Sequence, residues 1–286
     1  MSTPAASEDT RSTSADRVSR AAPGVDGAAD EQPLLRLRGV NKNFGSVRAL
    51  IGIDLDVPAG QVTALIGDNG AGKSTLIKAV SGISEADSGD IYWKGRPVSI
   101  RTPRDATALG IATVYQDLAL CDNLDIVDNM YLGRELRRHF LLDESAMEIG
   151  AKQALADLSV VTVHSVRQLV GSLSGGQRQA VAVAKAVMEA AELVILDEPT
   201  AALGVSQTAL VLELIKRLAS RGVAVVVVSH NLNDVFAVAD RIAVLYLGRI
   251  AVSGPVSDFD TQIAVQYITT GSAGRDDPVD TGESRG

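Results

Sequence analysis

Short apolar runs alternate with longer amphipathic stretches between residues 34 and 271. Four of these runs are rich in β-branched residues and predict buried strands, at Val62–Ile66, Ile111–Tyr115, Leu193–Leu196 and Val223–Val228. The stretch Ser206–Ser220 instead has the apolar spacing of a helix. Because strands that alternate with helices are typical of a parallel sheet covered on both faces, we expect an α/β fold.

Two segments depart from this alternation. Residues Leu35–Val57 contain two strand-like runs with no helix between them, which predicts an antiparallel β piece flanking the sheet. Residues 118–172 are mostly helical in pattern, with helices expected at Asp125–Leu132 and Asp143–Leu158. We therefore expect a helical lobe inserted into the α/β core. No internal repeat is present, so a second copy within the chain is not predicted.

The two ends of the sequence differ in composition from the middle. Residues 1–33 and 272–286 are rich in Ser, Thr, Ala, Asp, Glu, Gly and Pro, which predicts disordered tails around one folded domain at 34–271. These tails carry ten acids and five bases, or −5 of the formal net charge of −8. The nearly neutral folded part argues against a nonspecific nucleic-acid binder.

The apolar runs also bear on location. All of them fall short of the ~18 residues that cross a bilayer, and residues 1–33 lack the Leu, Ile and aromatic residues of a signal peptide. We therefore expect neither a membrane span nor secretion. The single cysteine, Cys121, excludes an internal disulfide and fits a reducing cytosol.

A glycine-rich segment between the first predicted strand of the sheet and a helix predicted at Thr75–Val80 matches the phosphate-binding pattern G-x-x-x-x-G-K-[ST]. Its glycines let backbone amides converge on phosphate oxygens, the helix N-terminus adds a partial positive charge, and Lys73 adds a full one. The Ser74 hydroxyl is placed to bind Mg²⁺. A glycine-rich turn with an incidental lysine is the alternative. The nucleotide-binding residues expected here are Gly67, Asp68, Asn69, Gly70, Ala71, Gly72, Lys73, Ser74 and Thr75.

Charged and polar residues follow two further predicted strands. Asp197 and Glu198 end the run at 193–196, at the edge where a parallel sheet binds ligands. We expect Asp197 to hold the magnesium ion with Ser74, and Glu198 to act as base or orienter for the attacking water. His230 follows the next strand and could approach the γ-phosphate. The alternatives are a strand that ends at a solvated turn and an ordinary surface or core histidine.

A second glycine-containing segment precedes a predicted helix at Gln177–Ala191. It runs Leu173, Ser174, Gly175, Gly176 and Gln177, so hydroxyl, amides and a helix N-terminus converge there as well. This convergence indicates another anion site. An ordinary N-cap followed by flexible glycines is the alternative.

In this order, the loop at 67–75, the Leu-Ser-Gly-Gly-Gln segment, the Asp-Glu strand end and His230 resemble the ATP-binding subunits of ATP-binding cassette (ABC) transporters, over about residues 34–270. The resemblance implies a P-loop NTPase core with ATP and Mg²⁺ as ligands. In that family two cassettes pair head to tail around ATP. It therefore implies that Ser174, Gly176 and Gln177 cap the γ-phosphate of the nucleotide held by a second copy of this chain.

The resemblance also assigns individual roles. It implies that Phe44 stacks on adenine, that Gln116 links the magnesium or water site to the helical lobe, and that Glu198 is the catalytic carboxylate. Lys73 belongs to the same catalytic set, and His230 is the implied γ-phosphate switch. For Phe44 a core aromatic, and for Gln116 a loop glutamine, are the alternatives. Because aromatic stacking discriminates only weakly between bases, the choice between ATP and GTP stays open.

One residue departs from the family pattern. Gly204 follows Pro199–Leu203 where the family usually has an aspartate that reaches across the dimer. A glycine offers no carboxylate, so communication across the interface is in doubt while the chemistry within one chain is untouched.

The sequences of Tyr115–Leu120 and Ser229–Leu232 resemble those of the carbohydrate-importer branch, which handles ribose, xylose, fructose and related sugars. This implies a polytopic membrane permease docked near Leu118–Glu135, indirectly a sugar-binding protein, and a place on the cytoplasmic face of the membrane. Leu124, Ile126, Met130 and Leu132 could instead form the core of the lobe.

Two other classes remain open from sequence. One is a soluble cassette ATPase that acts on nucleic acid or ribosomes, which the lack of basic extensions disfavours. The other is a small-molecule kinase, which needs an acceptor pocket and has no use for the Leu-Ser-Gly-Gly-Gln segment.

Overall fold

The fold was analysed in a computed structural model that describes residues 32–160, 162–188 and 191–272. The disordered tails expected from sequence fall almost entirely at 1–31 and 273–286, outside the described residues. Within the described ranges, no helix combines the length and hydropathy that crossing a bilayer requires.

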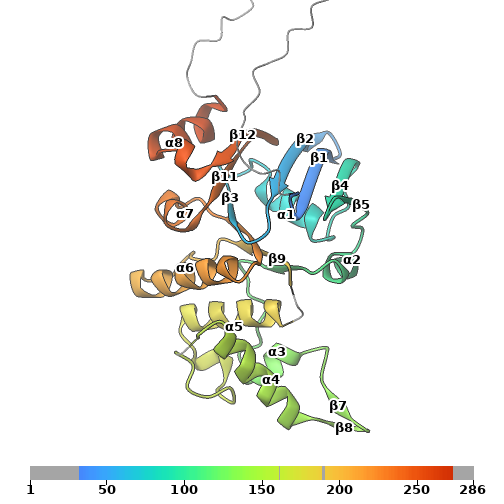
Figure 1. The fold of residues 1–286 in the computed structure, drawn as a ribbon, viewed down its shortest axis with the longest axis vertical. Coiled ribbons are helices and arrows are strands. Elements are labelled where there is room, and N and C mark those ends of the chain that lie inside the picture. Colours follow the sequence, from blue (N-terminus) through green and yellow to red (C-terminus); the bar gives the residue numbers. More distant parts are fainter. Residues whose placement is uncertain (1–31, 161, 189–190, 273–286) are drawn as a thin grey trace, which may run out of the picture. The chain divides into compact units, whose positions relative to one another are not determined.

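A six-stranded sheet forms the centre of the fold (Figure 1). Its strands, in spatial order, are β12 (Arg249–Pro255), β11 (Arg241–Tyr246), β3 (Val62–Gly67), β10 (Ala224–Val228), β9 (Leu193–Asp197) and β6 (Ile111–Val114). Five of the six strands run parallel, and only β12 pairs antiparallel, with β11. The four strands predicted from apolar runs are all in this sheet, within one residue at each end.

A second, antiparallel sheet flanks the first. Its order is β2 (Val47–Val57), β1 (Leu35–Phe44), β4 (Ser88–Trp93) and β5 (Arg96–Val98). The predicted antiparallel piece is therefore confirmed, and it contains two strands beyond those expected.

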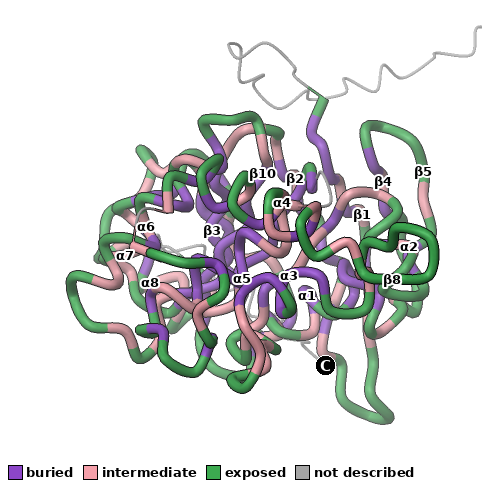
Figure 2. The backbone as a smooth tube through the Cα atoms, turned by 90° about the horizontal axis from the view of Figure 1, so that it is seen from below, coloured by how far each residue is buried: buried purple, intermediate pink, exposed green. Residues whose placement is uncertain are grey.

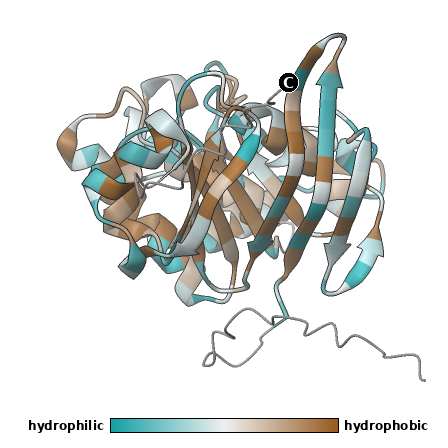
Figure 3. Cartoon of the chain, turned by 90° about the horizontal axis from the view of Figure 1, so that it is seen from above, coloured by the Kyte–Doolittle hydropathy of each residue, from teal (hydrophilic) through white to brown (hydrophobic). Residues whose placement is uncertain are grey.

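Helices cover the central sheet on both faces. They include α1 (Lys73–Val80), α2 (Pro103–Ala108), α6 (Val205–Ser220), α7 (Leu232–Val238) and α8 (Thr261–Thr270), with a 3-10 turn η2 (Val256–Asp258) before α8. Side chains of β10 alternate between two buried clusters, with Val225 and Val227 in one and Val226 and Val228 in the other. The central strands are accordingly buried throughout and apolar on both faces (Figures 2 and 3).

The predicted helical lobe contains α3 (Ile126–Tyr131), α4 (Glu144–Asp157) and the 3-10 turn η1 (Val170–Ser172). Both α3 and α4 pack against α5 (Gly175–Val187), which in turn packs against α6 and β6. The helix α5 therefore connects the lobe to the sheet. A small hairpin, β7 (Arg137–Arg138) and β8 (Leu141–Leu142), links α3 to α4.

A buried amide fixes the loop that enters the lobe. The side chain of Asn129 is fully buried; its Oδ1 accepts a hydrogen bond from the Cys121 amide at 2.7 Å. Its Nδ2 donates to the carbonyls of Cys121, Leu124 and Asp125. Every polar atom of this side chain thus serves the backbone of residues 121–125, which holds that loop against α3.

Candidate functional site

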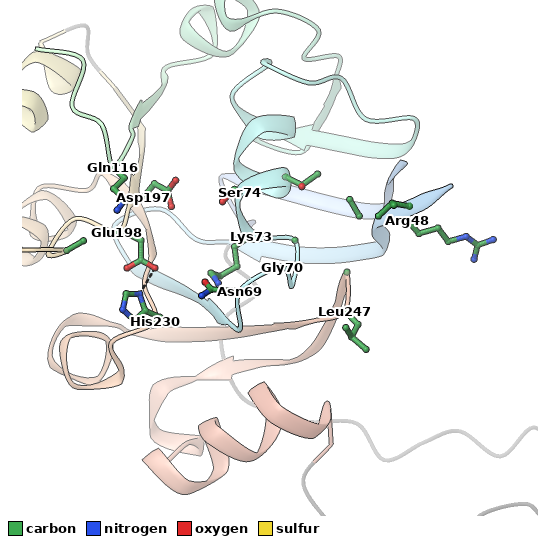
Figure 4. Close-up of a pocket in the computed structure, with 16 residues that line it drawn as sticks. Arg48, Asn69, Gly70, Lys73, Ser74, Gln116, Asp197, Glu198, His230 and Leu247 are labelled. Atoms are coloured by element: carbon green, nitrogen blue, oxygen red, sulfur yellow. Dashed lines mark hydrogen bonds and ion pairs between the residues drawn. The ribbon is translucent and has the colours of Figure 1, made fainter. Parts of the chain in front are cut away.

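A pocket of about 630 Å³ lies where β3, β9 and β10 end, at the edge of the central sheet (Figure 4). Most of the predicted site residues line it, namely Asn69, Gly70, Gly72, Lys73, Ser74, Thr75, Gln116, Asp197, Glu198 and His230. These residues come from four separate segments of the chain, and the topology of the parallel sheet brings them together.

Close backbone packing explains two glycines of the loop between β3 and α1. A Cβ added at Gly67 would lie 2.3 Å from the Leu245 carbonyl oxygen, and one at Gly72 would lie 2.7 Å from the Ala49 carbonyl oxygen. Both residues also have positive φ, at 156° and 110°. No side chain fits at either position, so the loop packs directly against β2 and β11.

Lys73 is buried at the start of α1, and its ammonium group holds the loop together. Its Nζ donates to the Gly67 carbonyl at 2.7 Å and to the Asp68 carbonyl at 2.9 Å. The positive charge thus sits inside the curve of the loop, where it adds to the partial charge of the α1 N-terminus.

The two carboxylates at the end of β9 are in different environments. Burial raises the pKa of Asp197, the adjacent Glu198 carboxylate raises it further, and Lys73 opposes both. Glu198 has a left-handed backbone, with φ of 50°, and its amide donates to the Val228 carbonyl at 2.9 Å. The turn therefore directs the two side chains differently, although they are adjacent in sequence.

Two side-chain contacts tie the segment after β9 to the segment after β10. Nδ1 of His230 lies 2.8 Å from Oε1 of Glu198 (Figure 4). The Thr200 hydroxyl donates to Asp234 at 2.6 Å. A carboxylate accepts, so the imidazole presents its Nδ1 hydrogen to Glu198. This leaves Nε2 for a second partner, and it fixes the Glu198 carboxylate on a rigid frame.

The donor set suits a magnesium ion that is held jointly by protein and phosphate. The pocket offers the Ser74 hydroxyl, the Gln116 amide and the Asp197 carboxylate, all oxygen donors. Among the described residues no group of three or more His, Cys, Asp or Glu could hold a metal alone. Mg²⁺ commonly keeps waters and phosphate oxygens while taking one or two protein ligands, so these residues fit the ion. A cation there would also offset the unfavourable burial of Asp197.

The second predicted anion site lies outside this pocket. Ser174 caps α5: its Oγ accepts from the Gln177 amide at 3.3 Å, while Gln177 Oε1 accepts from the Ser174 amide at 2.9 Å. Ser174 and Gly175 are exposed, whereas Gly176 is buried against Gln207. The ordinary N-cap considered from sequence is therefore present, and the exposed helix N-terminus is present as well.

Phe44 does not line the pocket. Its ring is 51% exposed at the end of β1, and the ammonium group of Lys42 lies 5.6 Å from the ring centroid. It is thus not the core aromatic that the sequence left as an alternative. Gly67, Asp68 and Ala71 also fall outside the lining.

Other residues form the wall of the pocket on the side of the antiparallel sheet. They are Val47, Arg48, Ala49, Leu247 and Gly248, and Ala201 closes the opposite side. None of these residues belongs to a motif that the sequence analysis identified. Leu247 and Gly248 form the turn between β11 and β12, and the Gly248 amide donates to the Ala71 carbonyl at 2.9 Å.

A groove of about 500 Å³ follows the junction between the lobe and the sheet. Leu118, Leu132 and Arg134 line it, all within the segment where docking was expected. Ile126 and Met130 are instead fully buried, so the core alternative is confirmed for these two. Leu132 is exposed, and it presents an apolar surface to the groove.

Gly204 is the N-cap residue of α6, without a side-chain cap. Its φ of −73° is accessible to any residue, and a Cβ added there meets nothing within 4 Å. Neither conformation nor space requires a glycine at this position.

Comparison with known proteins gives consistent matches. A family model described as ABC transporter matches residues 50–201. The chain is 47% identical over 247 residues to the fructose import ATP-binding protein FrcA of Rhizobium meliloti, covering 84% of this chain and 95% of the relative. It is 42% identical over 252 residues to the xylose/arabinose import ATP-binding protein XylG of Sulfolobus acidocaldarius, covering 88% and 99%.

A solved structure of similar fold is the nucleotide-free ATP-binding cassette of an ABC transporter. It superimposes with a TM-score of 0.72 at 26% identity, covering 82% of this chain and 98% of that chain.

Proposed function

Since this chain belongs to the ABC transporter family as an ATP-binding subunit, we propose that it hydrolyses ATP to power a sugar importer. The named relatives handle fructose and xylose or arabinose, which supports a monosaccharide as the transported class. The observation that carries the proposal is the single pocket that joins the Lys73 loop, the Asp197–Glu198 strand end and His230.

The loop at 67–75 holds the triphosphate in this proposal. The Lys73 ammonium lies inside the curve of the loop and Lys73 lines the pocket, so negative charge on the β- and γ-phosphates is matched by a positive group fixed in advance. Ser74 and Asp197, with Gln116, would hold Mg²⁺. When bound, the ion supplies Lewis-acid charge neutralisation at the phosphates.

Glu198 takes the role of catalytic carboxylate. Its side chain is largely buried and is oriented by the 2.8 Å contact with His230. A carboxylate held in this way can orient the attacking water and accept its proton. His230 also lines the pocket, so the same imidazole would position Glu198 through Nδ1 and, in the imidazolium form that carries a hydrogen on both nitrogens, donate from Nε2 toward the γ-phosphate.

Two copies of the chain complete the site. Ser174 and Gly175 are exposed at the N-terminus of α5 but lie outside the pocket of their own chain. A helix N-terminus of this kind binds anions. We propose that it caps the γ-phosphate held by a second copy, so that ATP joins two chains and hydrolysis releases them.

A permease is the other partner in this proposal. The groove at Leu118, Leu132 and Arg134 borders Tyr115, which directly precedes Gln116 of the nucleotide pocket. The Tyr115 hydroxyl also donates to Ser81 Oγ at 3.0 Å, just beyond the end of α1. A cytoplasmic segment of the permease in this groove would thus contact residues next to the nucleotide site and hold the chain at the inner face of the membrane.

Glu198→Gln provides the main test of the chemistry. The amide keeps the size of the side chain but cannot take a proton, so phosphate release should fall by about 10²–10⁴-fold while ATP binding persists. ATP-bound dimers should then accumulate on size-exclusion chromatography. Glu192→Gln, an exposed carboxylate that pairs with Lys94, is the matched control. Rapid hydrolysis by Glu198→Gln would remove this residue from the catalytic role.

The transport assignment needs a separate test. The chain should copurify with a polytopic permease, and the reconstituted complex should take up a monosaccharide at the expense of ATP. Transfer of phosphate to an acceptor, or stimulation by RNA alone, would overturn the assignment.

A further inference from the structure

The hairpin between α3 and α4 combines exposed apolar side chains with unpaired positive charge. Phe140 is 99% exposed, Leu141 76% and Leu142 51%. Arg137 and Arg138 are exposed too, and neither forms an ion pair with any residue in the described ranges. We propose that the tip of this hairpin inserts into the headgroup region of an anionic lipid bilayer.

The geometry of the hairpin separates its basic and apolar strands. Arg137 pairs with Leu142 and Arg138 with Leu141, and the Asp143 amide donates to the Leu136 carbonyl at 2.8 Å to close the base. One strand therefore presents two guanidinium groups and the other two leucines. Long cationic side chains can remain at the phosphate level while neighbouring apolar side chains enter the hydrocarbon boundary.

The loop of the hairpin lacks the residue types that most favour a tight turn. The register leaves a two-residue loop, His139–Phe140, and His139 has φ of 60°. Tight hairpin loops favour glycine or asparagine at positive φ. A histidine and a fully exposed phenylalanine occupy the loop instead, which indicates that this tip is built for contact with another surface.

Charge favours lipid over a permease loop as that surface. Cytoplasmic loops of membrane proteins carry an excess of Lys and Arg, which would repel Arg137 and Arg138. Anionic headgroups attract such residues. The nearest acid in sequence, Glu135, accepts from the Gly133 amide at 2.9 Å; this bond and, more weakly, the charge of Arg137 lower the pKa of its carboxyl, yet within the described part of the chain it forms no ion pair with Arg137 or Arg138. A hairpin with two-residue strands is also small beside the roughly 800 Å² that each partner buries in a standard protein interface.

The position of the hairpin agrees with this assignment. It begins three residues after Arg134, which lines the groove proposed for permease docking. Figure 1 shows β7 and β8 at the end of the lobe farthest from the central sheet. If the permease occupies that groove, the hairpin lies on the membrane-facing end of the lobe. This step alone rests on the proposed function.

Vesicle cosedimentation tests the inference without the permease. The full chain should bind vesicles of phosphatidylcholine mixed with phosphatidylglycerol, but not phosphatidylcholine alone, and added salt should weaken binding. Phe140→Ser with Leu141→Ser should lower the bound fraction at least about tenfold. Ile83→Ser with Val265→Ser, two exposed apolar residues outside the hairpin, is the control and should bind as the unaltered chain.

Charge variants test the second half of the inference. Replacing Arg137 and Arg138 by Gln should weaken binding to anionic vesicles by about fivefold for each charge removed. Arg96→Gln with Arg249→Gln, which removes two exposed arginines elsewhere, is the control. Equal binding by the hairpin and control variants, or no preference for anionic vesicles, overturns the inference.

A label at the tip reports insertion directly. Because Cys121 is the only cysteine, Phe140→Cys in a Cys121→Ser background carries one environment-sensitive fluorophore. Its emission should rise on addition of anionic vesicles. A response only to permease-containing vesicles, or on self-association without lipid, assigns the hairpin to a protein partner and overturns lipid insertion. Vesicle binding by a chain that fails to hydrolyse ATP would contradict the proposed function alone.

Discussion

The buried Asp197 carboxylate at the end of β9 lowers the stability of the folded chain. Burial and the neighbouring Glu198 raise the pKa of Asp197 in the native state above its value in the unfolded chain. The native state therefore binds more protons than the unfolded state in the window above the unfolded pKa. Stability therefore falls as the pH rises from the unfolded pKa through the raised pKa of Asp197.

Removing this charge should stabilise the nucleotide-free chain. We expect Asp197→Asn to raise the Tm at pH 7.5 by on the order of 1–2 °C, because the buried charge beside Glu198 is gone. The gain should shrink as the pH is lowered through the raised pKa of Asp197, and Mg²⁺-dependent ATP binding should be lost. Differential scanning calorimetry over a pH series measures the difference, with Asp90→Asn as an exposed control. A Tm gain that is the same at every pH would contradict the burial of this charge.

The charged and hydroxyl side chains of the pocket could be predicted because they stand in motifs of a few adjacent residues. Lys73, Ser74, Asp197 and Glu198 each follow a strand of strong apolar pattern, and the topology of a parallel sheet gathers strand ends on one edge. Leu247 carries no such chemistry. It lines the pocket only because the turn after β11 packs on the loop at residues 67–75, and no pattern in the sequence predicts that contact.

At the scale of elements, the lobe depends on one buried amide. Replacing Asn129 by Leu would leave the amide and carbonyl of Cys121 and the carbonyl of Leu124 without their partner. We expect a loss of roughly 2–4 kcal/mol in the free energy of unfolding, and a Tm lower by about 5–10 °C. Chemical denaturation measures this. Gln153→Ala, on the exposed face of α4, should change stability little by comparison.

A substitution at the N-terminus of α6 should stabilise the chain. Gly204→Asp should supply the missing N-cap and a favourable charge at the helix N-terminus, adding a few tenths to about 1 kcal/mol. Gly222, just past the C-terminus of the same helix, has φ of 88°, so Gly222→Asp should lose stability. Thermal unfolding of the two variants separates them. A loss with Gly204→Asp would show that the glycine serves the fold in this chain.

Elements with a long apolar pattern were predicted well, and short or mixed ones were not. The strands β3, β9 and β10 are buried over all or nearly all of their residues, and α6 buries Val211, Leu214, Ile215 and Leu218 at helical spacing, so these patterns are clear. The hairpin strands β7 and β8 are two residues long, which is too short for any period to appear. The strand β12 lies at the edge of the sheet and alternates only partly, because one of its sides has no partner strand.

At the scale of the molecule, the position of Ser174 outside the pocket of its own chain predicts which substitution should block formation of the proposed dimer. In a Glu198→Gln background, Ser174→Arg should abolish the ATP-bound dimer, because a bulky cation at the α5 N-terminus opposes docking on the second copy. The affinity of the single chain for ATP should change less than about twofold, since Ser174 is outside its own pocket. Multi-angle light scattering with and without ATP measures the assembly.

Ser220→Arg, at the C-terminal end of α6, serves as the control for this variant. Dimers that persist in Ser174→Arg would show that this serine has no role across the interface.

The contact of Lys73 with the carbonyls of Gly67 and Asp68 has a consequence for the speed of repeated turnover. Its ammonium donates to these two carbonyls before any nucleotide arrives and keeps its positive charge, so we expect the loop to hold its conformation after products leave. If two copies close on ATP as proposed, the interval between successive turnovers would then be set by their separation and reassociation, with no refolding of the loop.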